Sequence, residues 1–228
     1  MPVPENIHSI PLFFILGRTR SGTTMLRSMF DAHPNVIIPP EFPVLASVRS
    51  LVTSEWNVRT IERFVQLAAA NRKFVNIALK PDEIKEALIS ELEKNKSLTF
   101  NLAVKITLSL YRSAFQKDNV LAVGDKNPLY SLFPKEIRQA FPDAKFIFIY
   151  RNPYKVAESL YRFILAIFPG TQLQKVPADF TREKIVKMYT EIMNHYYLSK
   201  ILIPKHQLLE IRMEDFVKDK MGNLEKIY

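Results

Sequence analysis

Short apolar runs alternate along the chain with stretches in which apolar side chains recur every three or four residues. The apolar runs predict buried strands at 12–16, 36–38, 120–124, 145–150 and 207–212. The periodic stretches predict helices at 23–32, 61–70, 81–94, 98–115, 156–168 and 181–200, with a helical tail from Glu214. Strands that alternate with helices indicate an α/β protein whose parallel sheet is covered by helices on both faces.

The 228 residues show no internal repeat, low-complexity tract or clear linker. This length suits one α/β domain, and we therefore expect a single domain over residues 1–228. Residues 42–118 are mainly helical and are expected to form an insertion after the first strand–helix–strand unit. The chain ends at Tyr228 inside the predicted tail, so both a short protein and a fragment fit the pattern.

The amino-acid composition excludes several classes of functional site. The chain has no cysteine, which excludes disulfides, thiolate metal sites and a cysteine nucleophile. Its net charge of +9 favours anionic partners, but the basic residues are scattered rather than gathered in a tract. This pattern predicts a pocket for a small polyanion and no nucleic-acid binding. No apolar run is long enough to span a bilayer and the start lacks the features of a signal peptide, so we expect a cytoplasmic protein.

The loop between the first predicted strand and helix carries a dense set of anion-binding groups. Backbone N–H groups in such a loop, together with the helix N-terminus, point into one concavity and favour phosphate or sulfate. The loop is bounded by Gly17 and Gly22, and its candidate ligand-binding residues are Arg18, Thr19, Arg20, Ser21, Gly22, Thr23 and Thr24. The spacing resembles the Walker loop G-x-x-x-x-G-K-[ST], but Thr23 stands where the lysine of that loop belongs.

Two further strand ends carry charge. Arg151 follows the strand at 145–150, and Ser159 lies about two helical turns beyond it. Because ligands of open α/β sheets bind at the carboxyl ends of strands, these two residues are candidates to hold one phosphate together. Lys126 comes directly after the strand predicted at 120–124 and is a candidate to neutralise charge that develops on a transferring group.

These three motifs resemble those of the sulfotransferases that use 3′-phosphoadenosine 5′-phosphosulfate (PAPS). The segments 19–27 and 31–34 are similar to the family's 5′-phosphosulfate loop, especially in the branch with protein-tyrosine and bacterial carbohydrate-type enzymes. The segment 151–159 is similar to its 3′-phosphate signature, with Asn152 in place of the more usual aspartate, and 125–128 matches its Asp-Lys-[Thr/Asn]-Pro segment. The resemblance implies a P-loop-like three-layer sandwich and a reaction without metal.

The resemblance also assigns roles. Arg20 would assist the bridging oxygen, Lys126 would lie in or near the active site, and Glu41 would be the general base near the position of the branch's catalytic glutamate. The neighbouring Pro39, Pro40 and Phe42 would partly desolvate the Glu41 carboxylate and raise its basicity. His33 competes for the role of base, although its place beside Pro34 favours a structural role as a helix stop.

The sequence therefore predicts a sulfotransferase that moves a sulfuryl group from PAPS to an acceptor hydroxyl and releases adenosine 3′,5′-bisphosphate. Two alternatives remain open: a P-loop kinase or nucleotide hydrolase, and a non-catalytic polyanion-binding protein. The acceptor is also open among carbohydrate, lipid, tyrosine and small alcohol, and so is the oligomeric state.

Overall fold

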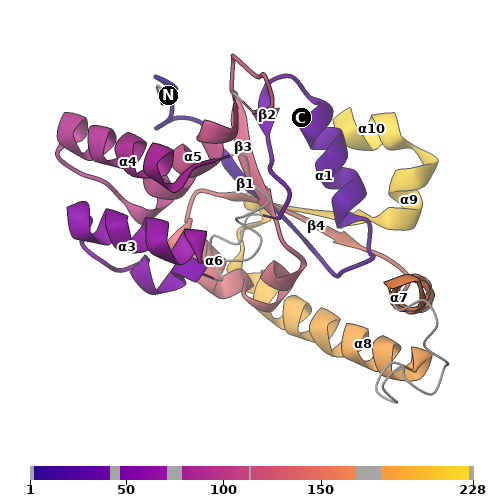
Figure 1. The fold of residues 1–228 in the computed structure, drawn as a ribbon. Coiled ribbons are helices and arrows are strands. Elements are labelled where there is room, and N and C mark those ends of the chain that lie inside the picture. The colour runs from indigo at the N-terminus through magenta and orange to yellow at the C-terminus, as the bar shows by residue number, and fades with distance from the viewer. Residues whose placement is uncertain (1–2, 42–46, 71–78, 113, 168–180, 226–228) are drawn as a thin grey trace. The chain divides into compact units, whose positions relative to one another are not determined.

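The structure is a computed structural model that describes residues 3–41, 47–70, 79–112, 114–167 and 181–225 (Figure 1). The chain divides into two compact units. The first unit comprises Met1–Phe14, Leu26–Asn127 and Glu136–Lys145, and the second comprises Ile15–Met25, Pro128–Lys135 and Phe146–Tyr228.

Five strands form one sheet in the order β2-β3-β1-β4-β5, and the pairs β2–β3 and β4–β5 are parallel. The strands are β1 (Leu12–Gly17), β2 (Val36–Ile37), β3 (Ala122–Lys126), β4 (Lys145–Tyr150) and β5 (Leu208–Arg212). Every residue of β1 is buried, as are the four inner residues of β4. Continuous apolar runs are typical of parallel strands covered on both faces, and the predicted α/β fold is confirmed.

Helices of the first unit occupy most of the predicted insertion. They are α3 (Val58–Ala69), α4 (Pro81–Asn95) and α5 (Phe100–Ser109), followed by the short helix η3 (Leu110–Arg112); η1 (Arg49–Leu51) precedes them. Asn57 and Thr99 cap α3 and α5 by accepting hydrogen bonds from Thr60 N and Leu102 N. Helix α3 packs against α4, α4 against α5, and α5 against β3.

The longer helices of the second unit come after β4 or β5 in the chain. They are α7 (Pro153–Ile167), α8 (Arg182–Ser199), α9 (Met213–Lys218) and α10 (Lys220–Glu225), with short helices η4 (Pro128–Leu132), η7 (Lys200–Leu202) and η8 (Lys205–Gln207). Helix α7 packs against α8, and η4 also contacts α8. Helices α1 (Thr23–Ala32) and α6 (Pro134–Ala140) each have residues in both units. Across the described ranges, no helix is long and apolar enough to cross a membrane.

The predicted bounds of β3 were wrong by two residues. The strand predicted at 120–124 lies at Ala122–Lys126, two residues further along the chain at both ends. Ala122 and Val123 pair with β2, and the strand continues through the buried residues Asp125 and Lys126, although glycine and aspartate are poor strand formers. Glycine is required at 124, because a Cβ there would lie 2.4 Å from the ring of Phe13.

Two helix predictions also needed correction. The helix expected over 98–115 ends at Ser109 and tightens into η3, and α6 was not predicted at all. Helix α6 has only seven residues, too few for a period of 3.6 to stand out. The loop expected from Pro169 to about Asp179 lies outside the described residues.

Candidate active site

A glycine stands at each end of the anion-binding loop. Gly17 is the last residue of β1, and Gly22 directly precedes α1. Gly17 has φ of 145°, and a Cβ added there would lie 2.4 Å from the carbonyl oxygen of Ile149. Gly22 has φ of 102°, and its added Cβ would lie 2.6 Å from Sδ of Met213. Residues with side chains rarely adopt such φ values, so backbone conformation requires glycine at both positions, and the backbone carbonyl beside Gly17 adds a steric reason there.

A pocket of about 190 Å³ opens beside this loop within the second unit. Its lining residues are Arg20, Gly22, Thr23, Thr24, Met25, Arg151 and Ser159. The structure thus brings residues of the loop together with Arg151, just after β4, and Ser159 of α7. Arg18, Thr19 and Ser21 do not line it: Ser21 is fully buried, and burial lowers the pKa of the Arg18 guanidinium.

Arg20 connects the two sides of this pocket. Its Nε donates a hydrogen bond to Oγ of Ser159 at 3.0 Å, and its guanidinium lies 5.0 Å from the centre of the Phe163 ring. Nη1 of Arg151 donates to the backbone oxygen of Arg20 at 3.3 Å. Arg20 also has φ of 71°, an uncommon backbone conformation for a residue other than glycine.

Two side chains that the sequence analysis missed hold the backbone of the β4–α7 turn. The buried hydroxyl of Tyr189 accepts a hydrogen bond from Arg151 N at 3.2 Å and donates one to Arg151 O at 2.6 Å. Burial raises the pKa of Tyr189, with the hydrogen bond to Arg151 opposing that rise. Oε1 of Glu214 accepts a hydrogen bond from Asn152 N at 2.9 Å. Tyr189 lies 38 residues from Arg151 and carried no local signal, whereas Glu214 stands directly after a predicted strand.

Asn152 starts α7 in the place where the resembling sequences usually have aspartate. Its Oδ1 accepts hydrogen bonds from Tyr154 N at 3.0 Å and Lys155 N at 3.4 Å. Asparagine and aspartate cap helices about equally well, so the substitution preserves the turn that carries Arg151.

A second, larger hollow of about 370 Å³ shares Arg151 and Ser159 with the pocket. Lys155, Glu158 and Arg162 of α7 line the rest of it. Glu158 pairs with Arg162 at 2.6 Å and with Lys155 at 3.7 Å, so the charges of these three side chains partly compensate one another. Arg151 and Ser159 thus face both the pocket and the hollow, so a ligand bound to them could extend into either space.

Glu41 and Lys126 form an ion pair in the first unit. Nζ of Lys126 lies 2.7 Å from Oε1 of Glu41, and the lysine side chain is 3% exposed while the carboxylate is 30% exposed. Glu41 has φ of 40°, the left-handed region that favours glycine. Non-glycine residues in such strained conformations persist where their surroundings hold them, which often marks functional sites. Phe42, expected to desolvate Glu41, lies outside the described residues.

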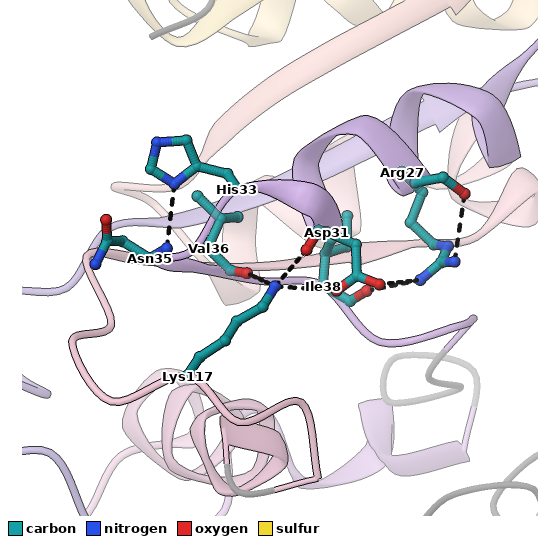
Figure 2. A network of polar contacts seen from close by, with 8 residues as sticks. Arg27, Asp31, His33, Asn35, Val36, Ile38 and Lys117 are labelled. Atoms are coloured by element: carbon teal, nitrogen blue, oxygen red, sulfur yellow. Dashed lines mark hydrogen bonds and ion pairs between the residues drawn. The ribbon is translucent and has the colours of Figure 1, made fainter.

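Lys117 holds the turn from α1 into β2, as Figure 2 shows. Its Nζ lies 3.2 Å from Oδ1 of Asp31 and donates a hydrogen bond to the carbonyl oxygen of Val36 at 2.6 Å. The Lys117 side chain is 9% exposed, so these bonds form largely out of water, where they are stronger. They fix the start of the strand that leads to Glu41.

Arg27 holds the other end of that strand (Figure 2). Its Nη1 donates a hydrogen bond to the carbonyl oxygen of Ile38 at 3.0 Å and lies 3.6 Å from Oδ2 of Asp31. No role was predicted for Arg27, the last residue of the segment 19–27, and in the structure it positions the chain three residues before Glu41.

His33 lies in the same turn. Its Nδ1 accepts a hydrogen bond from Asn35 N at 3.2 Å, and its backbone oxygen accepts one from Val36 N at 3.3 Å. Both bonds are local to the turn, which fits a structural role better than that of a base. Within the described ranges, no group of three or more His, Asp or Glu residues is arranged to hold a metal ion.

Comparison with known proteins identifies the class. The model of the sulfotransferase family matches residues 11–228, and the chain belongs to this family. It is 24% identical, over 99% of its length, to the Omega-hydroxy-beta-dihydromenaquinone-9 sulfotransferase of Mycobacterium tuberculosis, of which it spans 64%. A protein-tyrosine sulfotransferase of Drosophila melanogaster is 28% identical over 66% of this chain and 25% of its own.

A solved structure shows the same fold. The sulfotransferase domain from the curacin biosynthetic pathway superposes with a TM-score of 0.56 and 21% identity, covering 96% of this chain and 72% of that one. The predicted family and the predicted fold class are both confirmed.

Proposed function

We propose that this protein binds PAPS and transfers its sulfuryl group to the hydroxyl of an acceptor, releasing adenosine 3′,5′-bisphosphate. The observation that carries the proposal is the pocket in which the glycine-bounded loop meets Arg151 and Ser159. The two predicted phosphate-binding elements face one space, as binding of a nucleotide with two separated anionic groups requires.

The lining of the pocket suits such a ligand. Arg20, Arg151 and the hydroxyls of Thr23, Thr24 and Ser159 can all donate hydrogen bonds, and no carboxylate lines the pocket. Charge-assisted hydrogen bonds from arginine to phosphate are among the strongest polar contacts in proteins. Thr23 is buried and stands in place of the Walker lysine, which argues against the alternative of a kinase or nucleotide hydrolase.

Ser159 is prepared to donate to an anion. Its Oγ already accepts a hydrogen bond from Arg20, so its own hydrogen has to point elsewhere. Nη1 and Nη2 of Arg20 make no hydrogen bond within the described part of the chain, and their donors also remain for a ligand. The 3′-phosphate is assigned to Arg151 with Ser159, and the 5′-phosphosulfate to the loop Gly17–Thr24.

The chemical step follows from the roles that the resemblance assigns. The acceptor oxygen forms a bond to sulfur as the bond from sulfur to the 5′-phosphate oxygen breaks, and the hydroxyl proton passes to Glu41. Arg20 and Lys126 stabilise the negative charge on the transferring and leaving oxygens. Nζ of Lys126 lies 2.7 Å from Oε1 of Glu41, so the lysine stands beside the carboxylate that takes the proton.

The acceptor carries a hydroxyl, as the names of two relatives suggest: one is named for an omega-hydroxy menaquinone derivative and the other for protein tyrosine. We retain carbohydrate, lipid, tyrosine and small alcohol as the possible classes. Radiolabelled PAPS incubated with the protein and a crude extract, followed by mass spectrometry of labelled products, would identify the acceptor.

Calorimetry provides the direct test of the cofactor. The protein is expected to bind adenosine 3′,5′-bisphosphate and to prefer it to ADP, which lacks the 3′-phosphate. Preference for ADP, or binding of neither nucleotide, would refute the assignment. Failure to transfer label from PAPS to any acceptor, with nucleotide binding intact, would leave a binding protein rather than an enzyme.

A further inference from the structure

A separate cavity of about 220 Å³ lies in the first unit, around the start of α5. None of its residues belongs to the proposed nucleotide pocket or to the Glu41–Lys126 pair. The cavity is lined by His8, Ser97, Leu98, Thr99, Asn101, Leu102 and Lys105. Its volume is below the roughly 300–1,000 Å³ of pockets for drug-sized ligands, so it suits a small molecule or ion.

Lys105 gives the cavity its charge. Lys105 is 8% exposed, and its Nζ donates a hydrogen bond to the backbone oxygen of His8 at 2.8 Å. No carboxylate of the described residues lies within 4.0 Å of this ammonium group. Two other lysines with little side-chain exposure differ, since Lys117 and Lys126 lie 3.2 Å and 2.7 Å from Asp31 and Glu41. Burying a charge without a counter-ion costs free energy, so binding of an anion beside Lys105 would be favourable.

The carboxylate of Glu91, which contacts the lining residue His8, already has hydrogen-bond partners. Glu91 is buried, and its Oε1 lies 2.8 Å from Nε2 of His8 and accepts a hydrogen bond from Asn95 at 2.6 Å. Burial lowers the pKa of Lys105, and the more distant charge of Asp143 opposes that shift. The ammonium group therefore has a carbonyl oxygen as hydrogen-bond acceptor but no close carboxylate among the described residues of its unit.

Polar groups on the cavity wall could complete an anion site. Oγ1 of Thr99 accepts a hydrogen bond from Leu102 N, so the hydroxyl hydrogen points away from that bond. Oδ1 of Asn101 is buried and has no hydrogen-bond partner in the described part of the chain. The oxygen and nitrogen of an amide exchange places when the group turns over, which would present a donor in place of this oxygen.

We propose that this cavity binds a small oxyanion, such as a carboxylate, sulfate or phosphate, with Lys105 as its counter-ion. The hydroxyl of Thr99 and the amide of Asn101 add hydrogen bonds. Leu98 and Leu102 form apolar walls, which would accommodate the short alkyl part of an organic acid. The site is distinct from the nucleotide pocket and extends the proposed function rather than restating it.

The test uses the whole chain and follows His8, which lies on the cavity wall. Propionate, sulfate and phosphate are titrated in turn at constant ionic strength while the imidazole signals of His8 are recorded by nuclear magnetic resonance. The titrations use an Arg151→Ala background, which weakens anion binding at the nucleotide pocket. The expected result is a saturable shift of the His8 signals, with affinity at least about tenfold weaker after Lys105→Gln, as for loss of a charge-assisted hydrogen bond.

The relative affinities of propionate, sulfate and phosphate show which kind of anion the cavity binds. Tighter binding of propionate identifies an organic acid, and tighter binding of sulfate or phosphate identifies an inorganic ion. Absence of saturation by any probe, or equal affinities with and without Lys105, would overturn the proposal. If Lys105→Gln does not fold, Lys105→Arg, which keeps the positive charge, replaces it in the comparison. The titration of the Arg151→Ala protein with Lys105 intact then decides whether the anion binds.

The outcome is independent of the sulfotransferase assignment. In the presence of Arg151, Lys105→Gln is expected to leave the affinity for adenosine 3′,5′-bisphosphate within about twofold of the wild-type value, because Lys105 does not line that pocket. A loss of nucleotide binding in this variant would show that Lys105 serves the nucleotide site or the fold rather than a separate anion.

Discussion

The nucleotide pocket and the Glu41–Lys126 pair hold positive charge in opposite ways. Arg20 and Arg151 line the pocket together with hydroxyl groups, and no carboxylate lines it. Lys126, by contrast, is almost fully buried and has a carboxylate at 2.7 Å. Uncompensated charge favours an anion from solution, whereas compensated charge is stable until its partner changes.

That contrast suits the division of labour in the proposed reaction. When Glu41 takes the proton of the acceptor it becomes neutral, and Lys126 loses the charge that compensated its own. The lysine is then available to stabilise negative charge at the moment when that charge develops on the transferring group. A permanently free cation would bind substrate and transition state alike, and would do less for the rate.

The largest expected effect comes from breaking the compensated pair. Glu41→Gln removes the proton acceptor and is expected to lower the turnover of sulfuryl transfer by about 100- to 10,000-fold, the usual range for loss of a general base. Its affinity for adenosine 3′,5′-bisphosphate should stay within about twofold, because Glu41 does not line the nucleotide pocket. Steady-state kinetics and calorimetry measure the two quantities.

The matched control is Glu62→Gln, which breaks another ion pair of the first unit, with Lys85 at 2.8 Å. This exposed pair should have little effect on turnover. If Glu41→Gln retains turnover within about tenfold of wild type, the base is a different group, and His33→Gln becomes the next variant to examine.

A smaller effect is expected on the uncompensated side. Arg151→Ala should weaken binding of adenosine 3′,5′-bisphosphate by about 1.5–3 kcal/mol, or roughly 10- to 150-fold, for a lost charge-assisted contact. Affinity for ADP should change less, because ADP carries no 3′-phosphate. Arg63→Ala, at an exposed position of α3, is the control for loss of one positive charge. An unchanged affinity for adenosine 3′,5′-bisphosphate would remove Arg151 from the site.

Phe163 tests how Arg20 is held. Phe163→Leu keeps an apolar side chain but removes the ring 5.0 Å below the guanidinium. Cation–π contacts at exposed positions contribute about 0.5–1 kcal/mol, so nucleotide affinity should fall by roughly two- to fivefold. Phe163→Tyr preserves the aromatic face and should restore it. Equal affinities for the leucine and tyrosine variants would mean that the ring does not position Arg20.

The smallest effect concerns pH and the support beneath Arg151. Burial of Glu214 acts to raise its pKa, but hydrogen bonds from Asn152 N and its own N–H, with Arg212 nearby, outweigh burial and lower it overall. A lowered folded-state pKa stabilises the fold above the unfolded pKa of about 4.3, and this contribution is lost as the pH falls through the folded value. Glu214→Gln should therefore be less stable than wild type above about pH 5, with the difference vanishing toward pH 3.

Urea unfolding at a series of pH values measures that difference. Glu183→Gln, at an exposed position near the start of α8, serves as the control for removal of a carboxylate. A stability difference that persists unchanged at pH 3 would show that Glu214 acts through packing rather than through its charge.

Local features of the sequence predicted the secondary-structure elements around the proposed nucleotide pocket. A buried strand, a glycine-bounded loop and a periodic helix are contiguous from Leu12 to Ala32, and the structure places the helix at the predicted residues. Arg151 and Ser159 are likewise set by one strand and one helix. Such elements are encoded by periodicity, glycine and capping residues, which act over a few positions.

Long-range contacts could not be predicted. The resemblance pointed to Glu41 and Lys126 separately, but their pairing joins positions 85 residues apart. Lys117 and Tyr189 gave no signal, because a lysine after a helix and a tyrosine within one are common anywhere on a protein surface. Their importance comes from carbonyl and amide groups that only folding brings near them.

The bond between Arg20 and Ser159 has a consequence for timing. An arriving nucleotide meets a serine whose oxygen already accepts a hydrogen bond, so the serine can donate its own hydrogen to a phosphate without losing that partner. When the nucleotide departs, the bond from the arginine still holds the serine in place. The arginine thus orders the serine in advance, and nucleotide capture should follow a single kinetic phase in stopped-flow measurements.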